Sequence, residues 1–75
     1  MAPIAIVPRP GHEIRSELDG SIACLRDAGI EAHNAAVERA FALIWVDNRN
    51  ILISLETLSN AGFQATALTE TDVQH

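Results

Sequence analysis

Two stretches of this 75-residue chain end in almost the same way. Residues 25–32 have the sequence LRDAGIEA and residues 58–65 have LSNAGFQA, so a shift of 33 positions aligns the Leu, the Ala-Gly pair and the final Ala. A glycine that follows a helical stripe is typical of a helix end, because glycine adopts the left-handed conformation at little cost. The repeat therefore predicts two helices that end alike, each followed by a tight turn into a strand.

The residues before each Ala-Gly pair have apolar side chains at helical spacing. The first stripe consists of Ile14, Leu18, Ile22 and Leu25, and the second of Ile51, Leu55 and Leu58. Gly20 lies inside the first helix, where it either permits close packing or marks a break. The charged residues of this helix lie off the apolar stripe, so we expect its carboxylates, including those of Glu13 and Glu17, to face solvent.

Short apolar runs rich in β-branched residues predict strands at residues 3–7 and 41–46, and weaker signals predict strands at residues 30–37 and 64–68. With the two helices, the order becomes βαββαβ. This order is that of the ferredoxin-like α+β fold, a four-stranded antiparallel sheet with two helices on one face.

The whole chain, residues 1–75, is expected to form one domain, with a folded core at residues 3–68 and a polar, flexible tail at residues 69–75. A chain this short buries only about 60% of the surface that its unfolded form exposes, so its core is thin.

The run at residues 41–46 is apolar on both faces, which indicates a central strand. Phe41, Leu43 and Trp45 share one of these faces. That face lies either beneath the helices or on the open side of the sheet, where a second subunit would bury it, and the run leaves both alternatives open. Because the helices cover only one side of the sheet, we expect a homodimer.

The formal net charge is −5, and the five basic residues are arginines scattered along the chain. This distribution argues against nucleic acid and against an anionic membrane as partners. The single cysteine, Cys24, has no partner for an internal disulfide, which fits a reducing compartment. The first residues lack the basic segment and long apolar run of a signal peptide, and no run is long enough to span a membrane. We therefore expect a cytoplasmic protein.

Neither a metal site nor a catalytic site is indicated. His12, Cys24 and His33 are widely spaced and form no metal-ligand motif. Ser21 lies in a helix interior, without the Gly-x-Ser-x-Gly turn that presents a nucleophile. We expect no metal, no cofactor and no enzymatic activity.

Three segments resemble the ACT domain, a small regulatory module that binds amino acids in many metabolic enzymes. They are the first helix with its Asp27-Ala-Gly-Ile30 ending, the run 41–46 leading through Asp47-Asn48, and the second helix at residues 51–63 with its Ala-Gly-aromatic ending. Together they cover residues 14–68. The resemblance implies a regulatory or sensor domain that binds an amino acid or a similar small metabolite at a dimer interface.

The resemblance also implies where such a ligand would bind. One part of the site is the loop after the first strand, with Pro10, Gly11 and His12, and the other is the second strand of the partner protomer, with Glu31, His33 and Asn34. The alternative function is a ferredoxin-like dimerisation or protein–protein interaction module without a small ligand.

Overall fold

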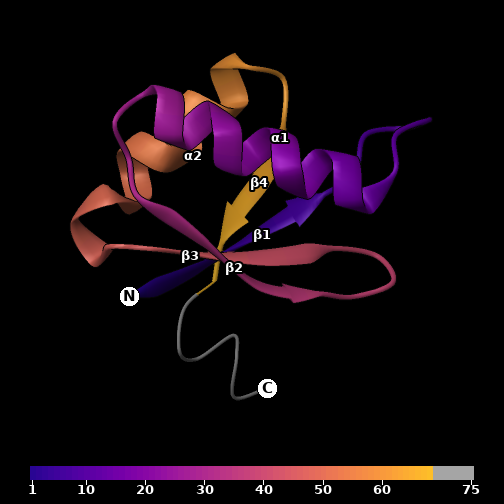
Figure 1. The fold of residues 1–75 in the computed structure, drawn as a ribbon, viewed down its shortest axis with the longest axis horizontal. Coiled ribbons are helices and arrows are strands. Elements are labelled where there is room, and N and C mark those ends of the chain that lie inside the picture. The colour runs from indigo at the N-terminus through magenta and orange to yellow at the C-terminus, as the bar shows by residue number, and fades with distance from the viewer. Residues whose placement is uncertain (69–75) are drawn as a thin grey trace.

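The computed structural model describes residues 1–68 (Figure 1). The strands are β1 (Ala2–Val7), β2 (Ala32–Val37), β3 (Ala42–Val46) and β4 (Gln64–Ala67), and the helices are α1 (Ile14–Asp27) and α2 (Ile51–Asn60). A short 3-10 helix, η1 (Asn48–Asn50), precedes α2. The predicted flexible tail, residues 69–75, lies outside the described residues.

The four strands form one sheet in the order β2-β3-β1-β4, and all neighbouring strands are antiparallel. Both helices lie on the same side of this sheet (Figure 1). The predicted ferredoxin-like βαββαβ fold is therefore confirmed. β3 lies inside the sheet, as its apolar sequence indicated, and β2 and β4 are the edge strands.

The repeated Ala-Gly sequences form two helix ends of the same geometry. After α1, the N–H of Ile30 donates to the carbonyl of Leu25 at 2.8 Å, and the N–H of Phe63 donates to that of Leu58 at 2.9 Å after α2. Gly29 and Gly62 have φ of 80° and 92°, the left-handed conformation that this cap requires. The repeat in the sequence is thus a repeated helix cap.

The core lies between the sheet and the two helices. Its most deeply buried side chains, at most 2% exposed, include Ile4, Ile6, Leu18, Leu25, Ile44, Val46 and Leu58. Because side chains alternate along a strand, Leu43 and Trp45 point to the other side of the sheet, and Trp45 is 38% exposed. Of the two alternatives for these side chains, the open face is therefore the correct one.

The expectation that Glu17 faces solvent is wrong. Its residue is only 1% exposed, because a guanidinium from the preceding loop pairs with its carboxylate at the edge of the core. Of the two roles considered for Gly20, close packing is correct. α1 runs through it without a break, and a Cβ placed there would lie 3.0 Å from the ring of Phe63.

Candidate functional site

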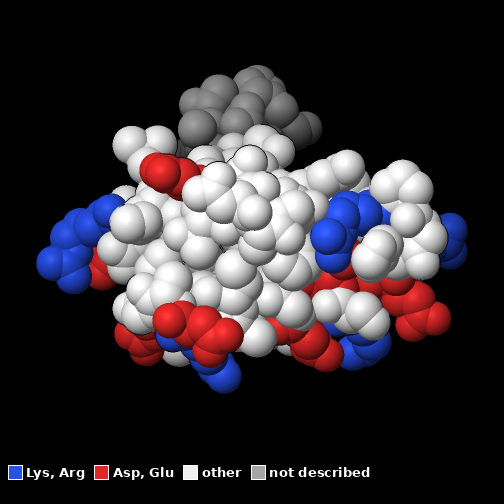
Figure 2. Space-filling view, turned by 90° about the horizontal axis from the view of Figure 1, so that it is seen from above, with Lys and Arg blue, Asp and Glu red and all other residues white. Residues whose placement is uncertain are grey.

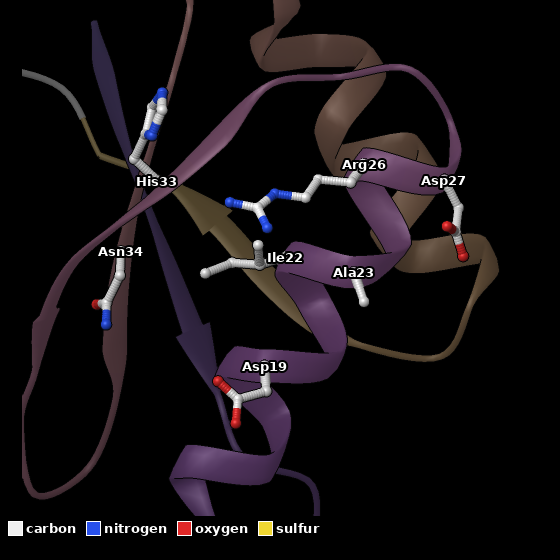
Figure 3. Close-up of a pocket in the computed structure, with 7 residues that line it drawn as sticks. All are labelled: Asp19, Ile22, Ala23, Arg26, Asp27, His33 and Asn34. Atoms are coloured by element: carbon white, nitrogen blue, oxygen red, sulfur yellow. The ribbon is translucent and has the colours of Figure 1, made fainter.

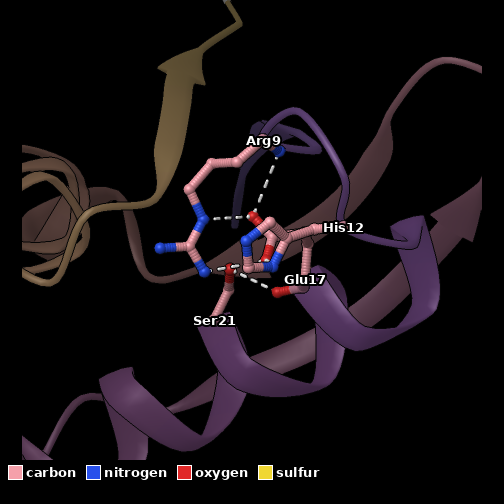
Figure 4. A network of polar contacts seen from close by, with 4 residues as sticks. All are labelled: Arg9, His12, Glu17 and Ser21. Atoms are coloured by element: carbon pink, nitrogen blue, oxygen red, sulfur yellow. Dashed lines mark hydrogen bonds and ion pairs between the residues drawn. The ribbon is translucent and has the colours of Figure 1, made fainter.

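The first part of the expected ligand site is the loop between β1 and α1, and its polar groups surround Glu17 (Figure 4). The Nε and Nη2 atoms of Arg9 donate to the two carboxylate oxygens of Glu17 at 2.9 Å each, and the Arg9 backbone N–H donates at 3.4 Å. His12 places Nδ1 3.3 Å from the same carboxylate. Pro10 and Gly11 are exposed at the tip of the loop.

This network connects three segments of the chain. The hydrogen bonds from Arg9 hold the pKa of Glu17 below its ordinary value, although burial of the carboxyl opposes this effect. The guanidinium also lies 4.8 Å from the ring centroid of Phe63, in the turn between α2 and β4. The polar groups of Arg9 and His12 are therefore used in an internal contact.

The second part of the expected site lies at the start of the edge strand β2, with Glu31 immediately before the strand. Glu31, His33 and Asn34 are all exposed, as expected for polar residues on a sheet edge. His33 Nε2 lies 3.1 Å from Glu31 Oε1.

One protomer does not bring the two parts together. β1 and β2 are both antiparallel to β3, so they run in the same direction. The loop with Pro10 and His12 follows the end of β1, whereas Glu31 precedes the start of β2. The six residues of β1 separate the two ends by about 20 Å at the usual rise of a strand.

Two open grooves of about 490 Å³ each flank the start of β2, and His33 borders both. The first, named here the α1 groove, is lined by Asp19, Ile22, Ala23, Arg26, Asp27, His33 and Asn34 (Figure 3). The second, the Asp47 groove, is lined by Met1, Gly29, Glu31, His33, Asp47, Arg49 and Asn50. Glu31, His33 and Asn34, which were predicted as ligand contacts, thus line grooves, whereas the three loop residues line neither.

The two grooves differ in whether their charged side chains form ion pairs. In the Asp47 groove, Arg49 Nη2 lies 3.2 Å from Asp47 Oδ2, and the Arg49 backbone N–H donates to Oδ1 at 2.9 Å. The backbone hydrogen bond, together with that of the side chain, lowers the pKa of Asp47. Within residues 1–68, neither Asp19 nor Arg26 of the α1 groove has an ion-pair or side-chain hydrogen-bond partner.

Asp19 and Arg26 were not predicted from the sequence as site residues. Their separation of seven positions, two helical turns, places both on one side of α1, and this spacing was the available signal. This spacing alone does not indicate a site. In the folded protein β2 lies beside that side of α1, and the two elements together form the groove.

The open side of the sheet has an apolar centre. The pairs Pro3–Trp45 and Ala5–Leu43 lie opposite each other on β1 and β3, and Val7 extends the row with 40% exposure. These residues, Pro3, Ala5, Val7, Leu43 and Trp45, are called the open-face patch below. On the opposite side, charged residues of both signs lie around the rim and the centre is uncharged (Figure 2).

Comparisons with known protein families, with curated proteins and with solved structures find no match to this chain. Among residues 1–68, no three or more His, Cys, Asp and Glu side chains gather in a way that could hold a metal ion. In the same part of the chain, neither helix combines the length and the apolar character needed to cross a bilayer.

Proposed function

We propose that this chain is a small regulatory domain of the cytoplasm that works as a homodimer, without catalysis of its own, and that the two protomers meet through the open-face patch. The observation that carries this proposal is the position of Trp45, a large apolar side chain that is 38% exposed on the side of the sheet opposite the helices. Val7 of the same patch is 40% exposed, and apolar side chains gathered on one surface usually mark an interaction site. Aromatic residues contribute disproportionately to the stability of such interfaces.

Burial of the open-face patch in a dimer also adds buried apolar surface to a protomer whose own core is small. A 75-residue chain has little apolar surface to bury within one protomer, and association adds burial without lengthening the chain. A second copy is the partner that is always present at the same concentration, and a two-fold axis makes the patch self-complementary.

The test compares two variants that each remove an exposed apolar side chain. Trp45→Ser alters the open-face patch, whereas Leu52→Ser alters α2, where Leu52 is 81% exposed on the other side of the molecule. We expect Trp45→Ser to raise the dimer dissociation constant about tenfold or more. Leu52→Ser should leave it unchanged. Sedimentation equilibrium measures the constants, and circular dichroism verifies that both variants are folded.

Because Trp45 is the only tryptophan, its fluorescence reports on the interface in the unmodified protein. Emission should shift to longer wavelength on dilution as the indole becomes exposed. A monomeric wild type, or equal dissociation constants for wild type and Trp45→Ser, contradicts the proposed interface.

A second candidate function is that of an ACT-like sensor, in which the dimer binds an amino acid or a similar small metabolite. The α1 groove favours this candidate, because it combines charged, amide and aliphatic side chains in one concave surface. A ligand with different affinities for two dimer geometries would shift the equilibrium between them, and a partner protein would respond to the favoured geometry. A thermal-shift screen against the twenty amino acids tests it, since a ligand that binds only the folded state raises the melting temperature.

A further inference from the structure

The α1 groove offers two opposite charges, Asp19 and Arg26, that no residue within the described range 1–68 pairs. Arg26 extends from α1 across the groove toward β2, and Asp19 lies further toward the N-terminus of the same helix (Figure 3). Ile22 lies between them, and Asn34 of β2 borders the groove on the other side. Asp27 also borders the groove, but its side chain points away from β2 (Figure 3).

The spacing of the two charges suits a small molecule better than a direct ion pair. Seven positions along a helix correspond to a rise of about 10.5 Å between α-carbons. Helical side chains lean toward the N-terminus, so the long Arg26 side chain shortens this gap while the short Asp19 side chain leaves it open. A small group with one negative and one positive end can bridge two such charges, with a hydrogen bond of about 3 Å at each end.

The loop between β1 and α1 is a poorer site for the same group. Its guanidinium and imidazole already contact the buried carboxylate of Glu17 at 2.9 and 3.3 Å. A ligand carboxylate there would have to displace Glu17 and leave a buried charge without its partner, which is costly. In the α1 groove, a ligand breaks no ion pair of Asp19 or Arg26 with any residue of the described part of the chain.

We propose that the α1 groove binds the zwitterionic backbone of a small α-amino acid, with its carboxylate on Arg26 and its ammonium on Asp19. The ligand's aliphatic atoms lie against Ile22, which is partly buried against the core, and the amide of Asn34 completes the site from β2. A guanidinium binds a carboxylate through two parallel hydrogen bonds, so Arg26 determines the orientation of the ligand. This inference rests on the second candidate function and assigns its ligand site to one protomer.

The experiment is a titration of the full chain, labelled with ¹⁵N, with each of the twenty amino acids in turn. We expect amide shifts at residues 19–27 and 33–34 with at least one amino acid. Arg26→Gln and Asp19→Asn should each weaken that binding about tenfold or more, as expected for loss of a charged hydrogen bond. Arg15→Gln and Glu56→Gln are matched controls, because both residues are exposed on the helices and border neither groove.

Two analogues of the bound amino acid test the zwitterion directly. The corresponding amine lacks the carboxylate and the corresponding carboxylic acid lacks the ammonium, and both should lose about tenfold or more in affinity. Equal binding of either analogue overturns the proposed pairing.

The outcomes separate the site from the function. If no amino acid shifts any amide in a folded wild type, the sensor function and this site both fail. If an amino acid binds wild type, Arg26→Gln and Asp19→Asn equally well, the sensor function stands and this site is wrong. The same holds if the amide shifts occur in the loop around Gly11 and not at residues 19–27 and 33–34.

Discussion

The guanidinium of Arg9 and the carboxylate of Glu17 form a two-pronged ion pair at the edge of the core, with both hydrogen bonds 2.9 Å long. The Glu17 side chain is 2% exposed and that of Arg9 is 31% exposed, so the carboxylate is the buried partner. Removal of the arginine therefore leaves a buried charge, whereas removal of both partners does not.

We expect Arg9→Ala to lower the melting temperature by several degrees, because Glu17 then lacks its main hydrogen-bond donor. The double substitution of Arg9→Met and Glu17→Leu should recover most of this loss, since no charge remains buried. Urea unfolding of the single and double variants measures the difference. Arg15→Ala, on the exposed side of α1, is the control and should change stability little. An Arg9→Ala variant as stable as this control contradicts the structural role of the pair.

The same ion pair predicts acid sensitivity. The hydrogen bonds from Arg9 lower the pKa of Glu17 in the folded state below the ordinary value of 4.5. At a pH between the lowered pKa of folded Glu17 and 4.5, the unfolded chain binds more protons than the folded chain. The contribution of ionised Glu17 to the free energy of unfolding is therefore complete above pH 4.5 and is lost as pH falls through the lowered pKa.

Melting temperatures measured from pH 7 downward should therefore begin to fall near pH 4.5, the ordinary glutamate value. Glu17→Gln should flatten this fall, although Asp47, whose pKa is also lowered, retains part of it. An identical pH profile for wild type and Glu17→Gln would show that Glu17 does not contribute.

Two buried serines should respond differently to replacement by alanine. Ser54 on α2 is fully buried, and its hydroxyl has no hydrogen-bond partner among residues 1–68. Ser54→Ala removes this unsatisfied group and should stabilise the protein by about 1 kcal/mol. Ser21 on α1 is equally buried, but its hydroxyl donates to the carbonyl of Glu17 at 2.7 Å. Ser21→Ala should therefore be neutral or destabilising. Denaturant unfolding measures the stability of both variants. A Ser54→Ala variant less stable than Ser21→Ala contradicts this prediction.

The contact of Gly20 with Phe63 predicts a departure from helix propensity. In an exposed helix, replacement of glycine by alanine stabilises by about 1 kcal/mol. Here the added Cβ would lie 3.0 Å from the Phe63 ring, and the ring centroid also lies 4.8 Å from the Arg9 guanidinium. We expect Gly20→Ala to destabilise the protein by about 1 kcal/mol.

The control for this prediction is the same substitution in a Phe63→Leu background, where the ring is absent and Gly20→Ala should become neutral or stabilising. A double-mutant cycle in urea measures the coupling between the two positions. Additive effects would mean that the ring does not resist the added methyl group.

Local patterns in the sequence were sufficient to predict the order of the elements. The Ala-Gly repeat identified both helix ends, because only a left-handed residue closes that cap and glycine adopts it most readily. The apolar run at residues 41–46 identified a central strand, and β3 is flanked on both sides. These features depend on residues close to each other in the chain, which is why they could be predicted.

Features that depend on distant residues could not be predicted. The charge of Glu17 indicated a solvent-facing position, but Arg9, eight residues earlier, pairs with it in the folded chain. In the sequence, Asp19 and Arg26 cannot be distinguished from other surface charges. In the structure, β2 lies beside α1 and forms a groove that both residues line.

The sequence by itself thus determined the βαββαβ order, the helix ends and the central strand, since these follow from side-chain periodicity and from the backbone preferences of glycine. The tertiary structure alone decided which side of β3 the helices cover. Both sides of that strand are apolar, so periodicity could not choose between them, and the choice left Trp45 exposed while Ile44 is fully buried.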